Sequence, residues 1–100
     1  MDITSQQIQQ AAPQAAAFLK TLAHTERLMI LCHLLNGEHC VRALREKSCL
    51  SQSAFSQHLA KLRHEGLVTT RKEAQTVYYA LAGTHSQRIL AALQTIYCHE

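Results

Sequence analysis

The sequence predicts a mainly α-helical domain that carries one small β-hairpin. Apolar residues recur with helical spacing along most of the chain, whereas a period of two is confined to the stretch between Gly66 and Leu81. The chain has 100 residues and shows neither an internal repeat nor a linker. We therefore expect a single domain over residues 1–100, and a chain this short would gain from pairing with a second copy of itself.

Composition and charge restrict the classes of protein to which the chain can belong. It is 47% hydrophobic and 17% charged, as globular domains are, and its net charge of +3 permits a polyanionic partner without requiring one. The N-terminal MDITSQQIQQ lacks a basic region followed by an apolar run, and the longest apolar-dominated stretch, LMILCHLL, is far shorter than a membrane span. We expect a cytoplasmic protein with no membrane partner, whose four cysteines are reduced thiols.

The first half of the chain predicts helices in three segments. Residues 4–22 are rich in Gln and Ala, and Pro13 either kinks this helix or starts its second half. The next helix ends near residue 35, before an Asn-Gly stop, and its apolar stripe consists of Leu28, Leu31, Cys32 and Leu35. A short helical piece at about 40–47 follows, with Val41 and Leu44 facing inward, and a turn occupies residues 48–51.

The second half predicts a helix, a hairpin and a last helix. Ser51 is placed to cap the helix in SQSAFSQHLAKLRHEGLV, whose inward stripe is Phe55, Leu59 and Leu62. Alternation then predicts a hairpin with RKEAQ at its tip. The last helix opens with the capping-box spacing Thr84-x-x-Gln87, and its apolar face consists of Ile89, Leu90, Leu93, Ile96 and Tyr97.

The order α-α-α-α-β-β-α is that of a winged helix-turn-helix, which presents its second helix to the major groove of DNA. Gln, Ser and Lys side chains on the outer face of the helix after Ser51 suit base edges and phosphates, and a basic hairpin suits phosphates. The candidate DNA-binding residues are Gln52, Ser53, Ser56, Gln57, Lys61, Arg71, Lys72 and Gln75. The alternative for this helix is an ordinary solvated face. His58 sits nearer the apolar stripe, which favours a partly buried histidine over a base contact.

The stretch LSQSAFSQHLAKLRHEGLVTTRKEAQTVYYAL resembles the recognition helix and wing of the ArsR-type winged-helix regulators. The resemblance covers residues 15–98 and is greatest to the thiol-based, sulfur-responsive branch that includes HlyU, BigR and SqrR, through Cys32 in ILC and Cys98 in IYC. It implies a homodimer joined by the first and last helices, which acts as a repressor or antirepressor at a near-palindromic operator.

Two of the cysteines are the candidate redox-sensing residues. Taken alone, Cys32 lies on an apolar stripe, where a small buried hydrophobe is the simpler interpretation. Cys98 lies off the apolar face of the last helix, so packing does not account for it. The resemblance implies that Cys32 and Cys98 face each other and are linked by a disulfide or a polysulfide bridge, with reactive sulfur species or an oxidant as inducer.

The alternative function is soft-metal sensing, of arsenite or cadmium, by Cys40 with His39 or Cys49. Cys40 matches the first cysteine of the family's ELCVCDL segment, which reads EHCVRAL here, so Arg42 replaces the second thiol. The last helix offers only His85 and His99 in place of the ligand pattern of zinc-sensing relatives. We therefore predict no metal and no cofactor.

An enzyme is not expected from this sequence. A nucleophilic cysteine needs an adjacent base and an oxyanion pocket, and the neighbouring pairs Cys32-His33 and His39-Cys40 project in different directions on helices. With three glycines the chain has no loop that could cradle a phosphate. A dimerisation module that does not bind DNA is the remaining alternative.

Overall fold

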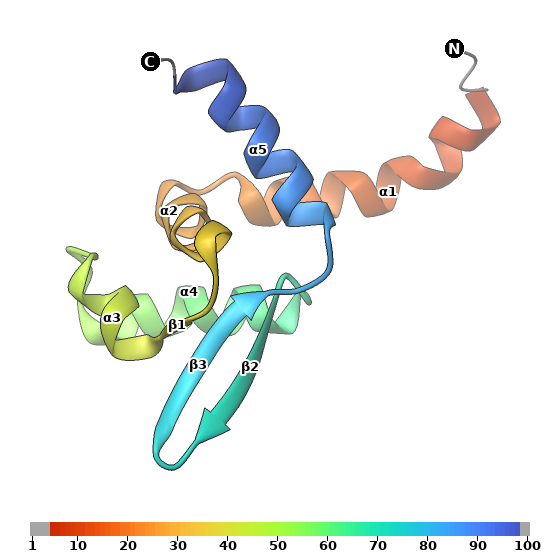
Figure 1. Ribbon diagram of the computed structural model, residues 1–100. Coiled ribbons are helices and arrows are strands. Elements are labelled where there is room, and N and C mark those ends of the chain that lie inside the picture. The colour runs from red at the N-terminus through yellow and green to blue at the C-terminus, as the bar shows by residue number, and fades with distance from the viewer. Residues whose placement is uncertain (1–4, 99–100) are drawn as a thin grey trace.

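The computed structural model describes residues 5–98 of the chain (Figure 1). Its elements are α1 (Ser5–Leu22), α2 (Thr25–His33), the 3-10 turn η1 (Leu34–Asn36), β1 (His39–Cys40), α3 (Val41–Glu46), α4 (Gln52–His64), β2 (Val68–Glu73), β3 (Thr76–Leu81) and α5 (His85–Tyr97). The architecture is the predicted winged helix-turn-helix, and the β2–β3 hairpin extends away from the helices as the wing (Figure 1). The ends of the predicted 1–100 domain lie outside the described residues.

The first two helices follow the sequence pattern closely. α1 continues through Pro13 rather than starting there, and its N-terminal half projects from the rest of the molecule (Figure 1). Residue 4, the predicted start of this helix, lies outside the described part. α2 passes into η1 and stops at Gly37, whose φ is 128°. Of the predicted stripe on α2 only Leu31 is fully buried, while Ile30, which the stripe omitted, is also buried.

The helix-turn-helix pair has well-formed ends. The Ser51 hydroxyl accepts a hydrogen bond from the Ala54 amide at 3.2 Å, as the sequence predicted for the start of α4. At the other end the Gly66 amide donates to the Arg63 carbonyl and the Leu67 amide to the Leu62 carbonyl, which is a Schellman motif. The φ of Gly66 is 79°, a conformation that suits glycine. These bonds fix the length and the direction of α4.

The sheet differs from the predicted hairpin in two ways. A third strand, β1, pairs with β3 through His39↔Tyr79 and Cys40↔Tyr78, so the strand order is β1-β3-β2. β2 extends to Glu73 and β3 begins at Thr76, so the predicted tip RKEAQ is wrong. Arg71 and Lys72 lie within a strand, and only Ala74 and Gln75 form the turn.

α5 returns across α2 and leaves part of its apolar face uncovered. Leu90 is fully buried, whereas Ile96 and Tyr97 are 58% and 76% exposed. Thr84 occupies the N-cap position of α5, but its side chain makes no capping hydrogen bond, so the predicted capping box does not form.

The core joins residues from every helix to the base of the wing. Its buried apolar members are Leu22, Ile30, Leu31, Leu34, Leu44, Phe55, Leu59, Leu62, Leu67, Val68, Tyr79 and Leu90. Among the described residues, no helix combines the length and the apolar character that crossing a membrane requires.

Candidate nucleic-acid interface and thiol pair

The outer face of α4 is polar and open to solvent. Phe55, Leu59 and Leu62 are buried on its inner face. The predicted DNA-binding residues of this helix are all exposed on the other side: Gln52, Ser53, Ser56, Gln57 and Lys61. Lys61 pairs with Glu65 one turn later at 3.3 Å. A single lysine–carboxylate pair within one surface helix contributes little, so it does not prevent Lys61 from meeting a phosphate.

A groove runs between α3, the start of α4 and the wing. Gln52 and Gln75, both predicted DNA-binding residues, lie on its opposite sides. Arg42 and Arg45 of α3 also line it, and the sequence analysis missed them. Their i, i+3 spacing on the helix that precedes the turn is the signal that could have identified them. Arg42 is strongly exposed and lies 3.9 Å from Glu46.

The two basic residues of the wing differ in their surroundings. Lys72 lies opposite Val77 and is exposed. Arg71 lies opposite Tyr78 and forms ion pairs with Glu38 and Glu73. The hydrogen bonds that Arg71 donates to Glu38 and then to Glu73 raise the pKa of its guanidinium, and the bond from Arg71 lowers the pKa of Glu38. Adjacent strand residues point to opposite faces of a sheet, so these two cations cannot meet the same phosphate.

His58 is half-buried and occupied by other contacts within the protein. Arg27 donates from Nε to Nδ1 of His58 over 3.3 Å, and the ring centroid of His24 lies 4.4 Å from that of His58. This geometry agrees with the sequence-based interpretation of His58 as a partly buried residue rather than a base contact.

The two predicted redox-sensing cysteines lie on α2 and at the end of α5. Cys32 is half-buried against the core, and Cys98 is exposed just beyond Tyr97. Burial, and then the charge of Cys98, raise the pKa of Cys32. Cys32, Cys40, Cys49 and Cys98 are all free thiols in this structure.

Comparison with known proteins places this geometry in a family. Residues 24–70 match the family described as bacterial regulatory protein, arsR family. The transcriptional activator HlyU of Vibrio cholerae is 47% identical over 93% of this chain and 86% of its own length. The chain belongs to the ArsR family. This ArsR-family protein is a transcriptional regulator, and the biofilm growth-associated repressor of Agrobacterium fabrum is 42% identical over 91% of the chain and 78% of its own length.

Solved structures of relatives show the same fold. Reduced HlyU from Vibrio cholerae superposes with a TM-score of 0.87 at 47% identity, covering 94% of this chain and 99% of that one. The homodimeric winged helix-turn-helix DNA-binding domain of Mb0332 from Mycobacterium bovis superposes with a TM-score of 0.76 at 32% identity, covering 96% and 89%. The fold of this ArsR-family regulator is therefore that of known DNA-binding domains.

The residues of the metal alternative do not converge. Cys40 caps α3, where its Sγ accepts a hydrogen bond from the Ala43 amide at 3.4 Å. His39 donates from Nδ1 to the Gly37 carbonyl at 3.0 Å, and Cys49 is exposed in the turn before α4. Within residues 5–98, no three His, Cys, Asp or Glu side chains are grouped so that they could hold a metal ion. His85 contacts Phe18 edge-on, and His99 lies outside the described residues.

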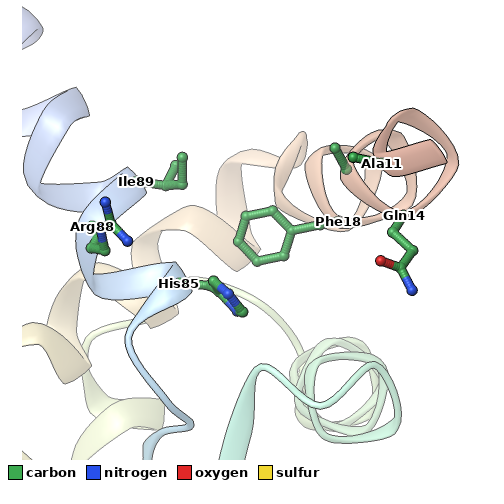
Figure 2. A pocket seen from close by; sticks show the side chains of 7 residues that line it. Ala11, Gln14, Phe18, His85, Arg88 and Ile89 are labelled. Carbon is green, nitrogen blue, oxygen red and sulfur yellow. The ribbon is translucent and has the colours of Figure 1, made fainter. Parts of the chain in front are cut away.

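The terminal helices of this ArsR-family regulator carry uncovered apolar surface. Figure 2 shows a hollow between α1 and α5, with Phe18 of α1 facing His85 and Ile89 of α5 across it. The exposed large apolar side chains are distributed over α1, α2 and α5: Ile8, Leu19, Met29, Ile96 and Tyr97.

Proposed function

We propose that this regulator is a homodimeric repressor or antirepressor whose affinity for operator DNA is switched by oxidation or persulfidation of Cys32 and Cys98. The observation that carries the proposal is that Cys32 on α2 and Cys98 just after α5 are free thiols at the ends of two helices in contact, in a chain whose α4 exposes a polar face beside the wing. α2 contacts both α4 and α5. A link between Cys32 and Cys98 therefore acts on α2, the helix against which α4 packs.

The proposed DNA-binding surface consists of the exposed face of α4, inserted in the major groove, and the wing. It contains Gln52, Ser53, Ser56, Gln57, Lys61, Arg71, Lys72 and Gln75, with Arg42 and Arg45 at its edge. Exchange of Gln57 for Ala should cost about 1–3 kcal/mol of discrimination at one base pair. Gln87→Ala, an exposed glutamine of α5, is the matched control. If Gln57→Ala leaves the ratio of operator to random-DNA binding unchanged, the proposed orientation of α4 is wrong.

A second copy of the chain is the proposed occupant of the apolar surface on α1 and α5. Exposed residues such as Ile96 and Tyr97 lie on that surface, and the Mb0332 relative is homodimeric. A two-fold dimer should place its two α4 helices about 34–36 Å apart, the spacing of successive major grooves. Light scattering at micromolar concentration should give twice the chain mass, and a monomer that binds operator tightly would contradict the dimer.

The proposed switch is a change in the relative stability of two dimer geometries. Linking the two thiols as a disulfide releases two protons and passes two electrons to the oxidant. With a polysulfide donor, sulfane sulfur atoms are inserted between the two thiols, and a further sulfane sulfur atom takes the two electrons and two protons and leaves as hydrogen sulfide. A coupling free energy of about 1–3 kcal/mol between the linked thiols and DNA corresponds to roughly 5–150-fold in operator affinity. A direct disulfide requires Cα atoms within about 7 Å, whereas inserted sulfur atoms tolerate a wider gap.

The switch is tested by titrating operator-bound protein with a polysulfide donor and, separately, with arsenite and cadmium. Release by the donor should disappear in Cys32→Ser and in Cys98→Ser and survive in Cys40→Ser, the matched control. Metal-driven release that depends on Cys40 would instead establish the soft-metal alternative and overturn the dithiol switch.

A further inference from the structure

A group of side chains shares one face of the sheet at the base of the wing. Arg71 on β2 lies opposite Tyr78 on β3, and Tyr78 lies opposite Cys40 on β1. Cross-strand partners, and residues two apart in one strand, point to the same face of a sheet. Glu73 therefore shares the face on which Arg71 and Tyr78 meet, and its ion pair with Arg71 brings Glu38, just before β1, to the same group.

The guanidinium of Arg71 makes several contacts within this group. Nε donates to the two oxygens of Glu38 over 3.0 and 2.9 Å, and Nη2 donates to Oε1 of the same carboxylate over 2.5 Å. Nη1 donates to Oε1 of Glu73 over 2.9 Å. Cζ of Arg71 lies 4.4 Å from the centroid of the Tyr78 ring, within the range of a cation–π contact. Every nitrogen of the guanidinium therefore has a partner.

These contacts join the wing to the body of the domain. Glu38 precedes β1 and is 33 positions from Arg71 in the sequence. Because β3 lies between β1 and β2, the Arg71–Glu38 pair spans the central strand of the sheet. Glu38 also follows η1, whose Leu34 is buried in the core. The pair thus fixes the outer strand of the wing to a segment anchored in the core.

The charge of this cluster argues against a phosphate contact by Arg71. Its single cation faces the carboxylates of Glu38 and Glu73, so the cluster has an excess of negative charge that repels a phosphate. Lys72 points to the opposite face of the hairpin, and among residues 5–98 no ion pair joins it to a carboxylate. The adjacent basic residues of the wing therefore have different tasks.

We propose that Arg71 is a positioning residue that holds the wing in place through Glu38 and Tyr78, and that Lys72 supplies the phosphate contact of the wing. The proposal rests on the proposed DNA binding for its functional consequence, but the anchor itself is a property of the free protein. The two tasks predict different responses to salt and to conservative substitution.

The first test measures operator affinity at several KCl concentrations for Arg71→Gln and Lys72→Gln. These variants remove the same charge at neighbouring positions, so each is the control for the other. Lys72→Gln should reduce the slope of log affinity against log salt by about 0.9 for each phosphate that the lysine neutralises. Arg71→Gln should weaken binding by roughly threefold to tenfold at every salt concentration and leave the slope unchanged. A reduced slope in Arg71→Gln would overturn the proposal.

The second test uses Arg71→Lys, Glu38→Gln and the double variant Glu38→Gln/Arg71→Gln. A lysine keeps the charge but not the fork of donors that holds a carboxylate, so Arg71→Lys should bind operator as weakly as Arg71→Gln. Glu38→Gln should weaken binding when Arg71 is present, because it removes the partner of Arg71. In the Arg71→Gln background it should not weaken binding, because there the substitution removes only the long-range repulsion between the carboxylate and DNA. Full affinity in Arg71→Lys, or stronger binding in Glu38→Gln with Arg71 present, would identify Arg71 as a phosphate contact.

The third test examines the anchor without DNA. Arg71→Gln and Glu38→Gln should shift the ring resonances of Tyr78 and accelerate amide exchange where β1 pairs with β3, at Cys40 and Tyr78, whereas Lys72→Gln should change neither. If the wild-type protein bound no DNA, these changes would still establish the anchor, and only the proposed function would fail. Unchanged exchange and unchanged Tyr78 resonances in both anchor variants would overturn the positioning role.

Discussion

Arg27 donates a hydrogen bond from Nε to Nδ1 of His58 over 3.3 Å and so ties α2 to α4. The same guanidinium donates from Nη1 to the carbonyl of Thr21, in the last turn of α1, over 3.2 Å. His24, between α1 and α2, places its ring centroid 4.4 Å from that of His58. One junction therefore connects the first helix with the helix that carries the candidate base contacts, and a histidine on that helix accepts the bond.

Stability should depend on the protonation of His58. Burial, then His24 and then Arg27 lower the pKa of His58, while Glu26 acts in the opposite direction. The unfolded chain therefore protonates His58 more readily than the folded protein does. The contribution of neutral His58 to stability is fully present above pH about 6.5 and is lost as the pH falls through the lower pKa of His58 in the folded state. The free energy of unfolding, measured by urea denaturation, should therefore decrease from pH 7 towards pH 5.

Substitution of His58 separates this effect from that of the other histidines. His58→Gln should flatten the decrease of unfolding free energy with falling pH, whereas His64→Gln, at an exposed position on the same helix, should leave it unchanged. A residual slope is expected because burial, and then Lys47 and His39, also lower the pKa of His33. Equal slopes in the two variants would exclude the junction as the source of the pH dependence.

The helix caps give a matched pair of stability predictions. The Ser51 hydroxyl accepts a bond from the Ala54 amide, whereas Thr84 occupies the same position of α5 without a capping bond. Ser51→Ala should therefore lower the free energy of unfolding by about 1 kcal/mol. Thr84→Ala should change it by less than about 0.5 kcal/mol. Chemical denaturation of both variants checks this, and a loss at Thr84 equal to that at Ser51 would contradict the cap assignment.

Local signals in the sequence were sufficient for most of the fold. The stripe of Phe55, Leu59 and Leu62 and the cap at Ser51 predicted α4 correctly, because burial and capping there depend on residues a turn or two apart. The alternation also predicted the hairpin, whose residue Tyr79 is buried in the structure. The exposed outer face of α4 followed directly from the same periodicity.

The features that the sequence did not reveal arise where distant segments meet. Strand β1 has two residues, too few for an alternation, and it exists only because β3 pairs with it. The sequence also does not reveal that Glu38 lies against Arg71, which it predicts as a DNA-binding residue. Arg42 and Arg45 were missed because the groove they line is formed by α3 together with the wing. Each of these features depends on tertiary contacts that a local pattern does not contain.

The glycine after α4 should be required for stability. Gly66 has a φ of 79°, and a Cβ at this position would meet no atom within 4 Å, so the cost of a side chain is conformational rather than steric crowding. Gly66→Ala should lower the free energy of unfolding by about 1 kcal/mol. The left-handed conformation costs an L-residue roughly 1–2 kcal/mol in the folded state, and alanine offsets part of this cost because it reduces the conformational entropy of the unfolded chain. Gly66→Asn should lose less, since asparagine tolerates this conformation. Thermal denaturation distinguishes them, and an alanine variant as stable as wild type would refute the conformational role.

The thiols should differ in reactivity towards an alkylating agent. Burial, and then the charge of Cys98, raise the pKa of Cys32 above its ordinary value of 9.0, so little of it is thiolate at neutral pH. Because the thiolate is the nucleophile, modification of Cys32 by iodoacetamide should rise about tenfold per pH unit up to pH 9 and continue to rise beyond it. Mass spectrometry of peptides taken at timed intervals would measure this rate for each cysteine.

The same difference sets the order of events in the proposed switch. Cys98 is exposed and meets an oxidant or a sulfur donor directly, while Cys32 is half-buried and carries the raised pKa. We therefore expect Cys98 to be modified first and Cys32 to attack the modified sulfur afterwards. In Cys32→Ser a persulfide or mixed disulfide should accumulate on Cys98, and in Cys98→Ser the modification of Cys32 should be slow at pH 7 and should accelerate as the pH is raised. Rapid modification of Cys32 at pH 7 in the Cys98→Ser variant would reverse this order.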